Sequence, residues 1–118
     1  MKFVIPFAGK PKARPRLNAN GPTFMPKDYM EWKDRVIEWA RFSRLHKQRI
    51  EGTVHIYAVF DTDKILVEVT PCGHKRPKGV GGDLDNLVGG LLDALQGAGV
   101  IDNDRNVMEI VASFADPE

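Results

Sequence analysis

The amino-acid sequence predicts an α+β fold with the element order β-α-β-β-α-β, in which a mixed sheet carries two helices packed on one face. Short β-branched segments alternate along the chain with two longer segments whose apolar residues recur every three or four positions. The chain has 118 residues, of which 42% are hydrophobic, enough for one core. We therefore expect a single domain over residues 1–118.

The first half of the chain supplies a strand and a helix. The strand is expected at residues 2–7, where Pro6 ends the apolar run. The helix is expected at residues 28–49, with Asp28 as its N-cap. Its aromatic stripe suggests core packing or base stacking, and core packing is the better interpretation. The stripe consists of the aromatic residues Tyr29, Trp32 and Trp39 together with Val36.

A hairpin and a second helix follow. Residues 53–60 and 64–70 are β-branched and alternating, and the short link between them predicts a hairpin. Asp61 and Asp63 in that link fit a turn, although they are also candidate metal ligands.

The second helix is expected from about residue 84, because six apolar residues follow the helical period without a miss until Gly97 and Gly99. Residues 106–114 are expected to form the closing strand.

Charge is segregated although the formal net charge is only +1. Residues 1–20 carry five basic side chains and no acid, whereas residues 83–104 carry five aspartates and no lysine or arginine. Two basic loops are candidates for contact with a polyanion, against the alternative of ordinary solvated surface. The candidate residues for this contact are Lys10, Lys12, Arg14, Arg16, Lys75, Arg76 and Lys78.

The aspartates around the second helix are candidate metal ligands. Helix capping and the macrodipole account for Asp83 and Asp85, but not for the second D-x-D at Asp102 and Asp104. Mg²⁺ takes oxygen ligands and usually only one or two carboxylates. The spacing fits neither an EF-hand nor a zinc site. The glycine pair 89–90 lies in the middle of the same helix. It indicates either that another backbone or a ligand approaches closely there, or that neighbouring packing offsets the cost of the glycines.

The location is expected to be cytoplasmic. A single cysteine excludes an internal disulfide and fits a reducing compartment. No run approaches the roughly 20 apolar residues of a membrane span. We expect no membrane partner.

Three runs resemble the RusA family of Holliday-junction resolvases. They are DLDNL at residues 83–87, LLDALQGAGVIDND at 91–104 and NV at 106–107. KPKARPR at residues 10–16 is similar to the K-x-R-P-R segment of that family. The resemblance implies a homodimeric, Mg²⁺-dependent endodeoxyribonuclease, with Mn²⁺ able to substitute and no small-molecule cofactor. Its substrate would be branched DNA, a four-way junction resolved by paired symmetric nicks in recombination and repair.

Carried over by position, the catalytic and metal-binding acids of the family fall on Asp83, Asp85 and Asp104, with Asp102 as a reserve metal ligand. A lysine of the family is replaced by Gly89, and an acid by Asn103. Two alternatives stay open. One is a non-catalytic, structure-selective DNA-binding protein of the same fold, and the other is a cation-stabilised interaction domain without a nucleic-acid role.

Overall fold

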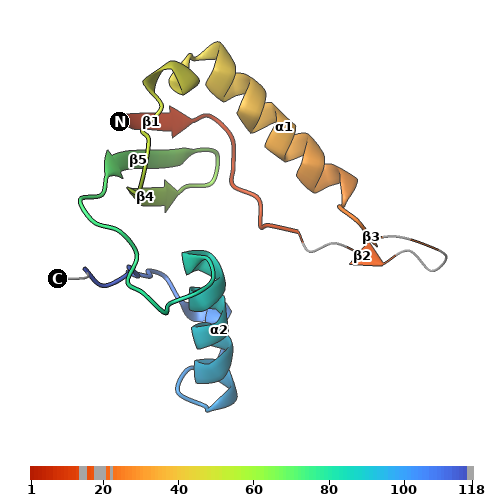
Figure 1. Cartoon of the computed structure of the whole chain (residues 1–118). Coiled ribbons are helices and arrows are strands. Elements are labelled where there is room, and N and C mark those ends of the chain that lie inside the picture. The colour runs from red at the N-terminus through yellow and green to blue at the C-terminus, as the bar shows by residue number, and fades with distance from the viewer. Residues whose placement is uncertain (14–15, 18–20, 22, 117–118) are drawn as a thin grey trace. The chain divides into compact units, whose positions relative to one another are not determined.

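The computed structural model describes residues 1–13, 16–17, 21 and 23–116, and the chain separates into two compact units (Figure 1). The first unit is Met1–Cys72 and the second is Gly73–Glu118. The predicted α+β class is confirmed by three antiparallel strands and two α-helices. Whether the units form the single predicted domain stays a prediction.

The sheet of the first unit consists of β1 (Lys2–Ile5), β4 (Val54–Phe60) and β5 (Ile65–Pro71) in the order β1-β5-β4. All of its strand pairs are antiparallel, whereas the sequence predicted a mixed sheet, so this part of the prediction is wrong for the described sheet. The predicted hairpin is confirmed, with Phe60 opposite Ile65 at its closed end. Asp61 serves the turn, because its Oδ1 accepts a hydrogen bond from the amide of Thr62 at 2.7 Å.

Helix α1 (Lys27–Phe42) belongs to the same unit as this sheet (Figure 1), and one aromatic pair joins the two. The ring of Trp39 packs on Phe3 of β1 with centroids 6.3 Å apart, and Trp32 Nε1 donates to the carbonyl of Ala8 at 2.9 Å. Ile65 of β5, on the same face of the sheet as Phe3, is 4% exposed. The aromatic stripe therefore contacts the sheet through Trp39 and the segment after β1 through Trp32.

The ends of α1 differ from the prediction. Pro26, not Asp28, occupies the N-cap position, because the carboxylate of Asp28 pairs with Lys10 and accepts a hydrogen bond from the amide of Tyr29. The helix stops at Phe42 instead of running on to residue 49. Arg44 takes a left-handed backbone, with φ of 60°, and the chain continues as a short 3₁₀ helix η1 (Leu45–Gln48).

The basic segment before α1 contains a small element that the sequence did not predict. Strands β2 (Arg16–Leu17) and β3 (Thr23–Phe24) pair antiparallel, with Arg16 opposite Phe24. This places one predicted DNA-binding position on a two-stranded ribbon instead of in an irregular loop.

The second unit contains α2 (Leu84–Gly97) and the 3₁₀ helix η2 (Asp104–Asn106). The predicted second helix is confirmed, but the strand expected at residues 106–114 is wrong, because residues 107–114 have no regular secondary structure. A strand requires a paired edge, and no strand is described in this unit. The placement of α2 on a face of the sheet stays a prediction. Neither α-helix of the described chain combines the length and apolarity that crossing a membrane requires.

Candidate functional site

The loop that leads into α2 is held by one arginine. The guanidinium of Arg76 donates to the carbonyl of Val80 at 3.3 Å and to the carbonyl of Gly82. The same group lies over the ring of Phe114, 4.3 Å from its centroid. Arg76 therefore fixes both the loop and the C-terminal segment of the second unit, whereas the sequence predicted a DNA contact for it.

This loop delivers two carboxylates to the start of α2. Asp83 is the N-cap residue with an extended backbone, and its carbonyl accepts from the amide of Leu87 at 3.0 Å. Its side chain makes no capping hydrogen bond, and Asp83 and Asp85 are both exposed. The pair therefore presents carboxylate oxygens to solvent at one helix end.

The second acidic pair lies at the other end of α2. The amide of Asp104 donates to the side-chain oxygen of Gln96 at 3.0 Å, and Asn103 caps η2 by accepting from the amide of Arg105 at 2.9 Å. The helical rise places Gln96 about 16 Å along the axis from Asp85. Asp102 precedes this turn and is exposed.

The predicted metal ligands are thus brought together only in part. Asp83 and Asp85 are neighbours, while Asp102 and Asp104 belong to the turn beside the C-terminal end of α2. Among the described residues, no group of three or more His, Cys, Asp or Glu side chains is placed to hold a metal ion. The local motif predicts the first pair; the position of the second depends on the turn after the helix.

Gly89 and Gly90 face open space in the described structure. A Cβ built at either position meets no atom within 4 Å apart from its chain neighbours and the backbone of α2 itself. The structure therefore shows no close backbone approach at these glycines, and a side chain fits at the position where the resemblance places a lysine.

The predicted DNA-binding residues differ in their surroundings. Lys10 Nζ lies 3.0 Å from the Asp28 carboxylate, so its charge is partly compensated within the chain. Lys12, Lys75 and Lys78 are exposed. Arg14 lies outside the described residues, and so does the side chain of Arg16.

The Lys10 contact also changes the acid–base behaviour of its partner. The hydrogen bond from Lys10, followed by the one from the Tyr29 amide, lowers the pKa of Asp28 below its ordinary value. Both contacts favour the ionised carboxylate. The loop after β1 is therefore tied to the first turn of α1 by a contact that needs Asp28 to be charged.

One basic segment was missed by the sequence analysis. Residues 41–49 surround the end of α1 and η1, and no acid occurs between Glu38 and Glu51. The four charged side chains of this segment are exposed, and they are Arg41, Arg44, Lys47 and Arg49. The run RFSRLHKQR carries the signal, but it was included in a helix that was expected to continue to residue 49.

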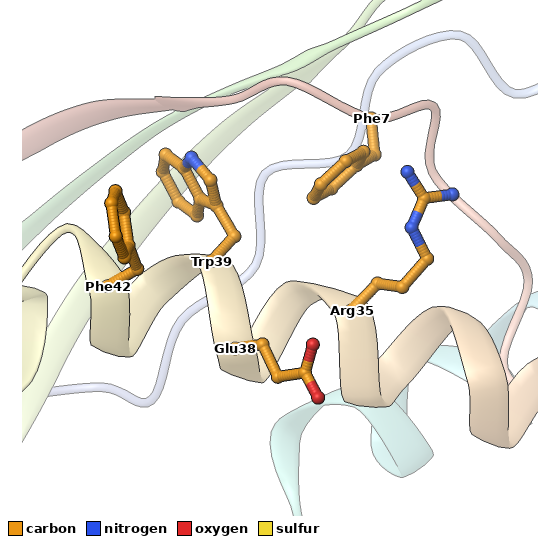
Figure 2. Close-up of a pocket in the computed structure, with 5 residues that line it drawn as sticks. All are labelled: Phe7, Arg35, Glu38, Trp39 and Phe42. Carbon is orange, nitrogen blue, oxygen red and sulfur yellow. The ribbon is translucent and has the colours of Figure 1, made fainter.

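An aromatic hollow adjoins that segment (Figure 2). It has a volume of about 370 Å³ and lies between the residues after β1 and the C-terminal half of α1. The guanidinium of Arg35 lies over the Phe7 ring, 4.3 Å from its centroid. The hollow is lined by Phe7, Arg35, Glu38, Trp39 and Phe42.

The family model described as endodeoxyribonuclease RusA matches residues 6–117. The chain belongs to the RusA family. The match covers both units, both acidic pairs and every predicted DNA-binding residue. Comparison with curated proteins and with solved structures gave no match. Membership in RusA supports nuclease activity and binding to branched DNA.

Proposed function

We propose that this RusA-family chain is a divalent-metal-dependent endodeoxyribonuclease that acts as a homodimer and resolves four-way DNA junctions by paired nicks. One observation carries the proposal. The carboxylates of Asp83 and Asp85 are exposed at the start of α2, and that of Asp83 is not used to cap the helix. This pair lies within a match to the family that spans residues 6–117.

The donor set of this pair suits Mg²⁺. Carboxylate oxygens are hard ligands, and Mg²⁺ usually takes one or two of them together with water and phosphate oxygens. Mn²⁺ accepts the same oxygen ligands. Asp104, with Asp102 in reserve, would join this set only after the segment that follows α2 moved, because its partner Gln96 lies about 16 Å along the helix axis from Asp85. When bound, such an ion activates water and neutralises the leaving oxygen of the scissile phosphodiester.

The chain itself supplies positioning and charge. The Arg76 contacts hold the loop that precedes Asp83, so they orient the acidic pair relative to the loop. Lys75 and Lys78 are exposed in the same loop and would bind phosphates beside the pair. A four-way junction has approximate two-fold symmetry, which an isologous homodimer matches.

The proposal is tested with Asp85→Asn. This change keeps the shape of the side chain but removes one negative charge. We expect nicking of a synthetic four-way junction in Mg²⁺ to fall by orders of magnitude, because water activation and leaving-group stabilisation both depend on the bound ion. Junction affinity in EDTA should hold or increase, since one charge that repels phosphate is gone. Asp93→Asn, an exposed acid of the same helix, is the matched control and should leave nicking unchanged.

Other outcomes assign the protein elsewhere. Nicking retained by Asp85→Asn would remove this residue from the metal site. Junction binding by the wild type without nicking in Mg²⁺ or Mn²⁺ would make the chain a non-catalytic, structure-selective DNA-binding protein. Absence of junction binding in EDTA and in Mg²⁺ would favour an interaction domain that only uses the cation for stability.

A further inference from the structure

The hollow on α1 combines flat aromatic surfaces with a guanidinium group. Trp39 is held by Phe3, and Phe7 lies under Arg35, so these two rings have fixed partners within the first unit. Phe42 is 90% exposed at the last position of α1. Figure 2 shows the Phe42 and Trp39 rings side by side on the helix, in a row that continues toward Phe7. The hollow therefore offers aromatic faces next to the positive charge of Arg35 and the negative charge of Glu38.

Exposed positive charge continues from the hollow along the chain. Arg41 immediately precedes Phe42, and Arg44 follows it at the left-handed residue that ends the helical segment. Lys47 lies in η1 and Arg49 just after it, both exposed. Nucleotides combine a flat base with an anionic phosphate, so aromatic rings beside exposed basic side chains match both parts. Aromatic faces stack on any base, whereas basic side chains contact the backbone.

We propose that this hollow is a nucleobase-binding subsite, in which an unpaired base of branched DNA stacks on Phe42 and Trp39. Arg41, Arg44 and Lys47 contact the phosphates on either side of that base. The inference rests on the proposed DNA substrate. It assigns to the first unit a second contact surface, made of residues other than the acidic pair and the two basic loops.

A stacking contact and a phosphate contact differ in their response to salt. We expect Phe42→Ala to weaken junction binding in EDTA by about five-fold or more at every salt concentration, because a lost base stack carries no charge. The slope of log affinity against log salt should stay at its wild-type value. Lys47→Ala should make that negative slope shallower by about 0.9, the value for one phosphate contact. Ile37→Ala, which shortens another exposed apolar side chain of α1, is the control and should bind as the wild type does.

The nature of the contact is tested by combining protein and DNA changes. Junctions with one abasic nucleotide at each position around the branch are titrated with wild type and with Phe42→Ala. At the position of the stacked base, the abasic junction should bind the wild type about as weakly as Phe42→Ala binds the intact junction. The two changes together should cost little more than either alone. Phe42→Trp should retain wild-type binding, whereas Phe42→Leu should bind as weakly as Phe42→Ala, because a leucine offers no aromatic face.

Three results would overturn the subsite. They are additive losses at every abasic position, wild-type binding by Phe42→Leu, and a lowered melting temperature for Phe42→Ala with unchanged DNA binding. The last result would mean that protein, not DNA, covers this ring. Mg²⁺-dependent nicking by the wild type and its loss in Asp85→Asn are measured on the same intact junction. Failure of the subsite with those two results intact leaves the nuclease proposal standing.

Discussion

Replacing Arg76 by alanine should destabilise the second unit instead of merely weakening DNA binding. The guanidinium donates to two loop carbonyls and lies over the Phe114 ring. A net hydrogen bond contributes about 0.5–1.5 kcal/mol, and an exposed cation–π contact about 0.5–1 kcal/mol. Since Arg76 is exposed and the three contacts are not independent, we expect Arg76→Ala to lower the free energy of unfolding by about 1–2 kcal/mol.

The assay combines urea unfolding with the salt dependence of junction binding. The unfolding midpoint of Arg76→Ala should fall, while the slope of log affinity against log salt stays near that of the wild type. Lys75→Ala is the matched control, because its side chain is exposed in the same loop. It should change stability by no more than about 0.5 kcal/mol and should make the negative salt slope shallower by about 0.9. Arg76→Lys keeps the charge but lacks the planar fork, so it should recover only part of the stability.

The opposite pattern would refute this reasoning. If Arg76→Ala unfolds at the wild-type urea concentration and makes the negative salt slope shallower, as Lys75→Ala does, the guanidinium of Arg76 contacts phosphate and not the loop. The sequence-based expectation of a DNA contact would then be restored.

Three other changes test separate features. Because Lys10 lowers the pKa of Asp28, the stability that this pair contributes is present above the ordinary aspartate pKa and is lost as pH falls through the lowered pKa of Asp28. Asp28→Asn should therefore remove this acid-induced loss of stability from a profile of melting temperature over pH 2–7. Arg44→Gly should raise the free energy of unfolding by about 1 kcal/mol, since φ of 60° strains an L-residue. It should also make the negative salt slope of junction binding shallower, because the proposed phosphate contact of the arginine is lost. An unchanged or lower stability would contradict the strain. Gly89→Lys should stabilise α2 modestly through helix propensity and raise the nicking rate; a fall in melting temperature would show a close approach at Gly89.

The parts of the fold that could be predicted from sequence are those that local patterns specify. The unbroken apolar period of α2 and the β-branched runs on either side of the Asp61 turn each contain enough information by themselves. The start of α1 does not, because Asp28 is taken up by Lys10 from a distant part of the chain. The apolar and β-branched residues of segment 107–114 indicate strand propensity, but a strand exists only where another edge accepts its hydrogen bonds.

The candidate site shows the same division. Asp83 and Asp85 could be identified from sequence because one short motif contains both acids and the start of the helix. The contact of Arg76 with Phe114 could not, since it depends on how the C-terminal segment returns to the loop. The basic segment at residues 41–49 was missed because the first helix was expected to continue through it to residue 49. The left-handed turn at Arg44 ends that helix early.

Electrostatics joins the two halves of the proposed site. Two carboxylates beside a phosphodiester repel it, so Asp83 and Asp85 oppose DNA binding until a cation neutralises them. Lys75 and Lys78 come from the loop that precedes the pair, and they supply positive charge that does not depend on a metal. Cation and DNA should therefore favour each other's binding by the same factor, as thermodynamic linkage requires. Under the proposed function, the basic loop and the acidic helix start lie next to each other in the chain because that stretch would hold both a cation and a polyanion.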